Sequence, residues 1–202
     1  MADGVYQRTG EQALVLASTS RFRRALLEAA ALPFRAVSPE VDESAPAGLP
    51  ARQLARALAL KKAQAVSARF PDALVVGSDQ TAELDGRLLR KPKSRAEARR
   101  QLSAMSGRVH CLHTGVALVR GEPAFRQVAV ETARLTLREL TRREIEAYLD
   151  TGEWEGCAGS YRVEAQGQKL MARVRGEHSA IVGLPMLSLV RMLARAGFPL
   201  FS

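Results

Sequence analysis

The segment STSRFRR, residues 18–24, combines three small hydroxyl side chains with three arginines. It follows the apolar run at 13–17, so the pattern predicts a strand, a turn and the first turn of a helix. Backbone N–H groups and the helix dipole at such a terminus favour an anion, and arginine adds a bidentate contact with phosphate. The alternative is a capped helix with solvated arginines, and the segment alone favours neither. Phe22, in its middle, is an aromatic side chain that phosphate binding does not require.

Three carboxylates, Glu40, Asp42 and Glu43, lie in the segment 38–50, whose Pro and Ser content predicts a loop. Loop carboxylates are usually solvated, and that interpretation fits any one of them. Carboxylate oxygens are nevertheless the ligands that Mg²⁺ or Mn²⁺ requires beside substrate phosphates.

The segment GSDQ, residues 77–80, directly follows the apolar run at 73–77, which predicts a buried strand. In open α/β sheets, ligands gather beyond the carboxyl ends of strands. Asp79 at such an edge could hold a metal ion or deprotonate a water. The alternative is an aspartate that only forms the turn before a hairpin.

Basic side chains that could complete such a site are Lys91, in the segment LRKP, and Lys61 and Lys62, in an earlier helical segment. A lysine is a point-charge ligand for phosphate, although a single one is most often a surface residue. Pro92 favours an extended backbone at Lys91, which could aim it. The basic groups, the acidic groups and the helix start are together what cleavage of a phosphoanhydride needs. No P-loop, nucleophile elbow or kinase motif competes with this interpretation.

Several elements must position these side chains, and strands and helices alternate irregularly along the chain, which indicates an α/β or α+β fold. Asp85-Gly86 predicts a hairpin. Ser94 with Glu97, and Thr141 with Glu144, each predict a capping box. Helices are expected at 22–31, 51–70, 95–105, 142–149 and after Pro185, and strands at 13–17, 34–37, 73–77, 109–119, 127–140, around 168–174 and at 180–182.

The composition is typical of a folded soluble protein, with 202 residues, 47% apolar and 25% charged. No apolar run is long enough to span a membrane, and no secretory signal is recognisable. Cys111 and Cys157 form neither a disulfide framework nor a metal-ligand spacing. His110 and His113, three apart on an expected strand, point to opposite faces and are expected to be structural. These features predict an intracellular, reduced environment.

The net charge of +9 raises the question of a nucleic-acid partner. The arginines are scattered along the chain, and no zinc-finger, RNP or basic-zipper pattern occurs. Aromatic residues are only 5%, which leaves few stacking platforms for single strands. A small polyanionic substrate explains local basic clusters equally well.

The order of motifs resembles the Maf family of nucleoside triphosphate pyrophosphatases, over about residues 14–198. The motifs are LASTSRFRR, PEVDE, ALKKAQ, VVGSDQ, LRKP, LSAMSGRVHCLHTGVAL, CAGSYRVE and IVGLP. The resemblance implies one Maf-like domain over residues 1–202, with residues 1–12 disordered or additional to it. The implied fold class is α/β, a Maf/inosine-triphosphatase-like elongated mixed sheet flanked by helices, with two lobes around a central cleft.

The resemblance also implies a reaction, in which a nucleoside triphosphate and water give the monophosphate and diphosphate with the help of a divalent metal cation, Mg or Mn. Members are typically cytoplasmic and often dimeric. We therefore expect a cytoplasmic enzyme that acts on a modified nucleoside triphosphate and can form a homodimer. No stable nucleic-acid partner and no membrane association are expected.

Residue roles follow from the motifs that this sequence shares with the family. Asp79 matches the proton acceptor, and Glu43 matches the acidic loop residue associated with metal binding or catalysis, so both are expected metal ligands. The positions that match phosphate contacts are Ser18, Arg23, Lys62 and Lys91. Two residues depart from the family pattern. Arg21 stands where proline is usual, and Ala165 stands where glycine is usual.

Phe22, Gln80 and Glu164 resemble the branch that hydrolyses 7-methyl-GTP, whereas the dTTP/UTP branch typically has arginine, threonine and glutamine there. N7-methylation makes guanine cationic, so the ring of Phe22 could stack on it with a cation–π attraction of roughly 0.5–2 kcal/mol. Glu164 could accept hydrogen bonds from N1–H and the exocyclic amine of guanine. Phenylalanine is a weaker cation–π partner than the tryptophan usual in this branch.

The sequence therefore predicts a hydrolase acting on acid anhydrides that removes 7-methyl-GTP from the nucleotide pool, with a link to cell division arrest allowed by the family. One alternative is a pyrophosphatase with dTTP/UTP or broad specificity. Another is a non-catalytic nucleotide- or nucleic-acid-binding regulator of division. A third is a scaffold protein of a septum complex.

Overall fold

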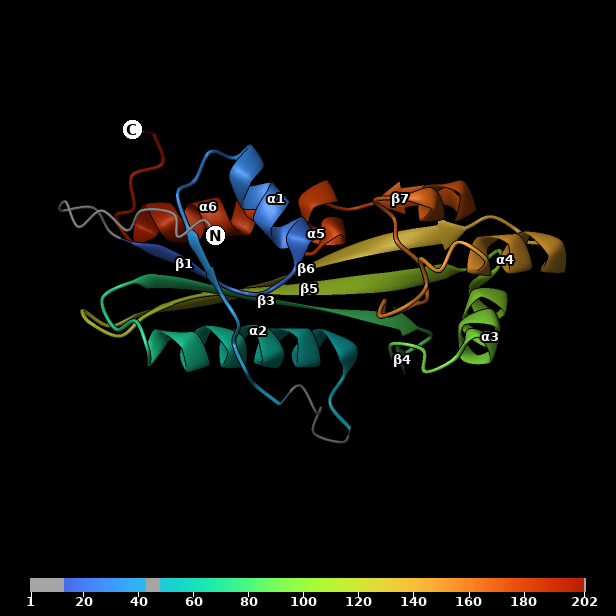
Figure 1. The fold of residues 1–202 in the computed structure, drawn as a ribbon, viewed down its shortest axis with the longest axis horizontal. Coiled ribbons are helices and arrows are strands. Elements are labelled where there is room, and N and C mark those ends of the chain that lie inside the picture. Colours follow the sequence, from blue (N-terminus) through green and yellow to red (C-terminus); the bar gives the residue numbers. More distant parts are fainter. Residues whose placement is uncertain (1–12, 43–47, 202) are drawn as a thin grey trace.

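The computed structural model describes residues 13–42 and 48–201 of the chain, and within them a single mixed sheet carries helices on both faces (Figure 1). The strands are β1 (Leu14–Ala17), β2 (Arg35–Val37), β3 (Leu74–Leu84), β4 (Arg87–Leu89), β5 (Val109–Arg120), β6 (Phe125–Leu137) and β7 (Met171–Arg175). The helices are α1 (Arg21–Ala29), α2 (Ala51–Ser67), α3 (Arg95–Met105), α4 (Arg142–Leu149), α5 (His178–Val182) and α6 (Met186–Arg195), with a 3₁₀ helix at Gln166–Leu170.

The strand order in the sheet is β2-β1-β3-β5-β6-β7, and β4 pairs with β3 at one end. β1 lies parallel to β2 and β3, whereas β3, β5, β6 and β7 pair in antiparallel fashion. The long strands β3, β5 and β6 run along the long axis of the molecule and connect its two ends (Figure 1). The expected elongated mixed sheet flanked by helices is therefore confirmed. No helix among the described residues is long and apolar enough to cross a bilayer.

The strand predicted at 73–77 is longer than expected, because β3 continues to Leu84. β5 pairs with it along this length, from Val75 opposite Val119 to Glu83 opposite Cys111, so the backbone groups of its polar residues are satisfied by the ladder. The prediction that Asp79 lies beyond the end of a strand is wrong, and so is its alternative of a turn. The predicted hairpin at Asp85-Gly86 is present, since it joins β3 to β4.

Helix α2 lies unusually close to the sheet, because two glycines face it. A Cβ atom on Gly77 would lie 2.2 Å from the carbonyl oxygen of Ala59, and one on Gly115 would lie 2.3 Å from that of Ala55. Any side chain larger than hydrogen would push the helix away. The close approach brings Lys62 of α2 within reach of the polar centre of β3.

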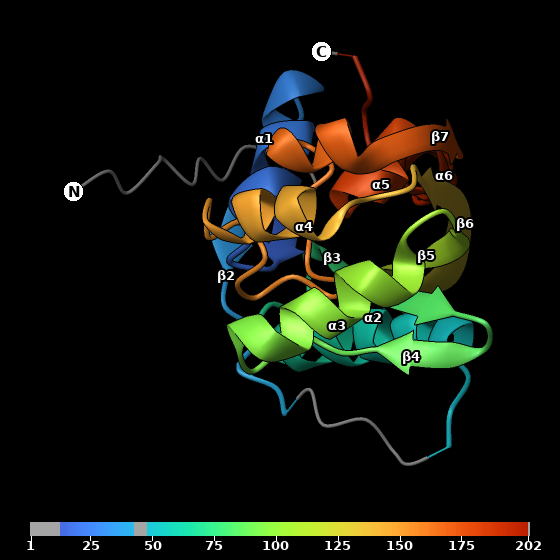
Figure 2. The ribbon, with the colours of Figure 1, turned by 90° about the vertical axis from the view of Figure 1, so that its right-hand side faces the viewer.

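The other face of the sheet is covered by α1, α5 and α6 at one end and by α3 and α4 at the other (Figures 1 and 2). One apolar cluster joins α1 and α6 to β1, β3 and β5 through Leu27, Leu189, Leu16, Val76 and Val116, among others. A second cluster joins α3 and α4 to the far ends of β3, β5 and β6 through residues such as Leu102, Leu149, Leu112 and Leu135. The two ends therefore have separate cores on this face, joined by the long strands.

Local capping signals fixed the helix starts that the sequence predicted. Thr141 and Glu144 form the complete capping box at the start of α4. At α3 the Ser94 hydroxyl accepts from the backbone N–H of Glu97 at 3.2 Å. The Glu97 carboxylate accepts from the backbone of Lys93 instead of Ser94, so the reciprocal half of that box is shifted by one residue.

Two predicted strands in the last third of the chain need correction. Residues 180–182 belong to helix α5, and residues 168–170 belong to the 3₁₀ helix, so that β7 begins only at Met171. The last-turn carbonyls of α5 accept hydrogen bonds from side chains of β3 and β5, as described below. Because these partners are distant in sequence, the local preference of Ile181 and Val182 for strand did not decide the structure.

Candidate active site

A cavity of about 590 Å³ opens between the two ends of the molecule. Its walls come from the β1–α1 connection, the segment after β2, α2, β3, the segment before α3, residues 155–164 and the end of α5. Of the candidate residues that the structure describes, the cavity is lined by Ser18, Phe22, Arg23, Glu40, Lys62, Asp79, Gln80, Lys91 and Glu164. Asp42 and Lys61 are not part of the lining, and Nζ of Lys61 donates to the backbone carbonyl of Asp42 at 2.7 Å. Glu43, the remaining one, lies outside the described residues.

The start of α1 is arranged to receive an anion. Ser20 caps the helix, and its hydroxyl accepts from the backbone N–H of Arg23 at 3.5 Å. Nη1 of Arg23 donates to the hydroxyl of Ser18 at 3.1 Å, and Nε donates to the carbonyl of Gly183 at 2.9 Å. The first turn holds no acidic side chain, so the positive end of the helix dipole and Arg23 act together at the cavity wall.

The floor of the cavity carries a buried ion pair. Nζ of Lys62 lies 2.6 Å from Oδ1 of Asp79, and the two residues expose only 4% and 7% of their surface. Since β3 passes through Asp79, the carboxylate is held by the sheet and not by a loop. Removing either member of such a buried pair leaves the other charge uncompensated, so the two side chains are expected to act as a unit.

A metal ion beside a triphosphate usually takes one or two protein carboxylates and fills its remaining positions with phosphate oxygens and water. Asp79 fits that requirement, because it brings an oxygen ligand to the cavity next to the candidate phosphate-binding groups. No group of three or more His, Cys, Asp or Glu side chains that could hold a metal unaided occurs within residues 13–42 and 48–201. The residues therefore fit a cation that is shared with a substrate.

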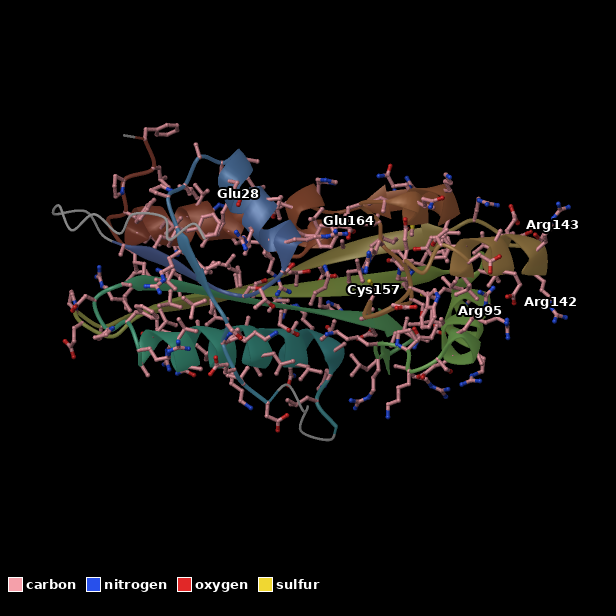
Figure 3. The ribbon with its side chains drawn as sticks, in the orientation of Figure 1. Glu28, Arg95, Arg142, Arg143, Cys157 and Glu164 are labelled. Atoms are coloured by element: carbon pink, nitrogen blue, oxygen red, sulfur yellow. The ribbon has the colours of Figure 1, made fainter. Side chains whose placement is uncertain are left out.

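Phe22 and Glu164, the expected base-recognition residues, both line the cavity. Figure 3 shows Glu164 and Cys157 near the middle of the molecule, whereas Arg142 and Arg143 project at its far end. The guanidinium carbon of Arg21 lies 4.7 Å from the centroid of the Phe22 ring. Arg21, where proline is usual in the family, is the first residue of α1 and is not part of the cavity lining. One face of the Phe22 ring therefore already contacts a cation.

Gln80 lines the cavity, but its amide nitrogen contacts the protein. Nε2 lies 3.0 Å from the carbonyl oxygen of Ala180, 2.9 Å from that of Ile181 and 2.9 Å from the hydroxyl of Thr114. The Thr114 hydroxyl itself donates to the carbonyl of Ala180 at 2.8 Å. Gln80 and Thr114 thus hold the end of α5 against the sheet, and any effect of the Gln80 nitrogen on a substrate is indirect.

The motif CAGSYRVE contributes more residues to the cavity than the predicted Glu164. Cys157, Tyr161 and Arg162 line the cavity beside Glu164. Nε of Arg162 lies 3.4 Å from the sulfur of Cys157, and this hydrogen bond is the largest cause that raises the pKa of the arginine. Their membership of one motif on one loop was the signal that could have identified them.

His110 and His113 were expected to be structural, and neither lines the cavity. Nε2 of His110 lies 2.6 Å from the hydroxyl of Tyr161, and burial lowers the pKa of this histidine to about 4. Burial also raises the pKa of Tyr161. Nδ1 of His113 lies 2.9 Å from the hydroxyl of Thr132. His110 thus supports one wall of the cavity from behind.

Residues 13–196 match the family model described as Maf-like protein. A 7-methyl-GTP pyrophosphatase of Xanthomonas axonopodis pv. citri (strain 306) is 50% identical over 92% of this chain and 97% of its own length. A nucleoside triphosphate pyrophosphatase of Nitrobacter winogradskyi is 47% identical, over 91% and 94% of the two chains. A dTTP/UTP pyrophosphatase of Symbiobacterium thermophilum is 42% identical, over 95% and 97%.

Among solved structures, the Ham1 protein of Staphylococcus aureus has a similar fold, with a TM-score of 0.53. The alignment covers 92% of this chain and 100% of that one, at 13% sequence identity. At this identity the likeness concerns the fold alone. It agrees with the mixed sheet that the sequence predicted.

Proposed function

Because the chain belongs to the Maf-like protein family, we propose that it is a nucleoside triphosphate pyrophosphatase that hydrolyses 7-methyl-GTP to 7-methyl-GMP and diphosphate. The observation that carries the proposal is the cavity, which gathers the acidic, basic and aromatic groups of six separate segments around one space. The relative from Xanthomonas axonopodis, which bears the name of this activity, aligns over nearly the whole chain. The enzyme is then a hydrolase acting on acid anhydrides, and it removes a modified nucleotide from the pool.

In the proposed reaction a water molecule attacks the α-phosphorus, and the bond from this phosphorus to the α–β bridging oxygen breaks. Asp79 takes the proton of the water, while the bridging oxygen leaves with diphosphate. Ser18, Arg23 and Lys91 contact the phosphates, and the ammonium group of Lys62 holds the carboxylate of Asp79 in place.

A divalent cation, Mg²⁺ or Mn²⁺, is part of the proposal. Asp79 and Glu43 would hold it, and it would neutralise part of the charge on the phosphate oxygens. The basic groups at the start of α1 also neutralise the negative charge of the triphosphate, so they can bind the nucleotide in part without the cation. Addition of a chelator should therefore abolish turnover, whereas binding of the nucleotide should only weaken.

The preference for 7-methyl-GTP rests on Phe22 and Glu164. The cationic methylated ring is attracted to the face of Phe22 by about 0.5–2 kcal/mol, and it offers Glu164 the N1–H and amine donors of guanine. A pyrimidine presents acceptors to a carboxylate at this position and loses binding. The relative named dTTP/UTP pyrophosphatase supports the rival specificity, with dTTP, UTP or a broad range of nucleotides as substrates.

A panel of nucleotides tests the proposal. Diphosphate release is measured from 7-methyl-GTP, GTP, dTTP, UTP and CTP with Mg²⁺ or Mn²⁺ and with chelator. The expected result is metal-dependent release that is fastest from 7-methyl-GTP and absent in Asp79→Asn. Asp72→Asn, which changes an exposed aspartate in the turn before β3, is the matched control and should keep full activity.

Other results would identify the alternatives. Preference for dTTP or UTP would contradict the specificity and keep the enzyme class. No release from any nucleotide, together with binding to nucleic acid that weakens steeply with salt, would favour a binding protein that regulates division. The absence of both diphosphate release and nucleic-acid binding would favour a scaffold protein. We also expect a cytoplasmic location and a homodimer, which fractionation and analytical ultracentrifugation can examine.

A further inference from the structure

Gln101, a half-buried residue of α3 outside the cavity lining, contacts two segments that do form the cavity wall. Its amide nitrogen Nε2 donates to the backbone carbonyl of Arg90 at 2.9 Å. Its amide oxygen Oε1 accepts from the hydroxyl of Ser160 at 2.7 Å. One side chain therefore joins the segment around Lys91 to the segment around Glu164, although the two are far apart in sequence.

The contact with Ser160 holds a strained position. Ser160 has a φ of 64°, in the left-handed region that residues with a side chain rarely adopt, and it follows Gly159 with a φ of 81°. Ser160 has no exposed surface, so its hydroxyl needs a partner inside the protein, and Gln101 provides it. Tyr161 and Glu164 follow directly on this turn, so their place on the cavity wall depends on it.

The contact with Arg90 acts on the phosphate side. Residues 90–92 have no regular secondary structure, and Lys91 within them lines the cavity. Pro92 is buried and cannot donate a backbone hydrogen bond. The bond from Gln101 to the carbonyl of Arg90 ties this segment to helix α3 and limits where the ammonium group of Lys91 can lie.

We propose that Gln101 is a positioning residue that sets the distance between the phosphate-binding segment at Lys91 and the base-binding segment that contains Glu164. The inference rests on the proposed function, because it concerns how the same cavity holds both ends of one nucleotide. The amide suits the task since its nitrogen can only donate and its oxygen can only accept. Each half of the bridge can therefore be removed separately.

Two substitutions separate the halves. Gln101→Glu keeps an acceptor for Ser160 but turns a carboxylate oxygen towards the carbonyl of Arg90, which breaks the phosphate-side bond. Ser160→Ala removes the donor of the base-side bond and keeps Gln101 on Arg90. Ser160→Gly does the same while accepting the left-handed φ, so it serves if the alanine variant folds poorly.

The readout is binding of the two products, measured by calorimetry with diphosphate alone and with 7-methyl-GMP and GMP. Gln101→Glu should weaken diphosphate binding roughly threefold to tenfold, the effect of one hydrogen bond, and leave the ratio of 7-methyl-GMP to GMP affinity unchanged. Ser160→Ala should reduce that ratio by a similar factor and leave diphosphate binding unchanged. Ser103→Ala, an exposed serine on the same helix, is the control and should change neither quantity.

The proposal would be overturned if Gln101→Glu and Ser160→Ala changed the diphosphate affinity and the 7-methyl-GMP to GMP ratio equally. It would also be overturned if neither variant changed either quantity. A separate result would overturn the proposed function alone, namely wild-type protein that binds the products but hydrolyses no triphosphate. The Gln101 comparison would remain valid in that case, because it depends on binding and not on turnover.

Discussion

The ion pair between Lys62 and Asp79 can be tested by making it neutral one side at a time. Lys62→Met leaves the carboxylate of Asp79 buried beside a thioether, and Asp79→Asn leaves the ammonium of Lys62 beside an amide. The double variant replaces two charges by two neutral groups of nearly the same volume. The three variants together separate the stability of the fold from the chemistry of the carboxylate.

The geometry gives the expected size of each effect. At the 2.6 Å separation between Nζ and Oδ1, and with an effective dielectric constant of about 20, the attraction is about 6 kcal/mol. Loss of hydration offsets much of it, so the intact pair adds little net stability. Lys62→Met keeps the hydration loss of the Asp79 carboxylate without this attraction, and should cost about 3–5 kcal/mol. The double variant should recover at least about 2 kcal/mol relative to the sum of the single changes.

Urea unfolding at neutral pH measures these costs. With a slope of about 2 kcal/mol/M, Lys62→Met should lower the midpoint by roughly 2 M, and the double variant should lie well above the additive value. Diphosphate release should be lost in both variants that lack Asp79, including the stable double one. Additive costs would refute the buried pair, and turnover in the double variant would refute Asp79 as the proton acceptor.

Three further predictions concern other parts of the structure. Burial lowers the pKa of His110 from 6.5 to about 4, so the unfolded chain binds a proton first as the pH falls. The free energy of unfolding should therefore decrease by about 3 kcal/mol between pH 6.5 and 4. Urea unfolding at both pH values should show this decrease, and His110→Asn should not. Gly115→Ala places a Cβ 2.3 Å from the carbonyl oxygen of Ala55, so it should cost about 1–3 kcal/mol or more of stability and lower the melting temperature. The control Gly152→Ala has open space at its Cβ but an unfavourable φ of 72°, and it should cost less stability. Phe22→Trp should raise the kcat/KM ratio of 7-methyl-GTP to GTP several-fold, because tryptophan is the stronger cation–π partner; an unchanged ratio would show that Phe22 does not stack on the base.

The parts of the fold that local sequence could predict are those that local physics decides. The box of Thr141 and Glu144 satisfies backbone donors within one turn, so it fixes the start of α4 without help from elsewhere. The hairpin at Asp85-Gly86 is equally local, since both residues adopt the left-handed φ, 49° and 76°, that the tight turn requires. Such elements keep the bounds that their own residues dictate.

Elements that depend on distant partners were predicted less well. The five residues of α5 contain a strand-like run, but Gln80 and Thr114 supply hydrogen-bond donors to its carbonyls. Their order in the sequence does not reveal this contact. The candidate site shows the same difference between local and distant information. The order of the motifs identified the residues around the cavity. The contacts of Gln101 with Arg90 and Ser160 could not be predicted in this way, because only the fold brings the three segments together.

One signal in the sequence could have led to the Lys62–Asp79 pair. Gly115 stands in the middle of a run that reads as a long strand, and glycine in a strand interior marks a place where another backbone approaches closely. In the structure Gly115 lies directly opposite Asp79, and α2 presses on it through Ala55. A helix held farther from the sheet would move Nζ of Lys62 away from Oδ1 of Asp79. The glycines of β3 and β5 therefore serve the chemistry as well as the packing, because they let α2 deliver a cation to the floor of the cavity.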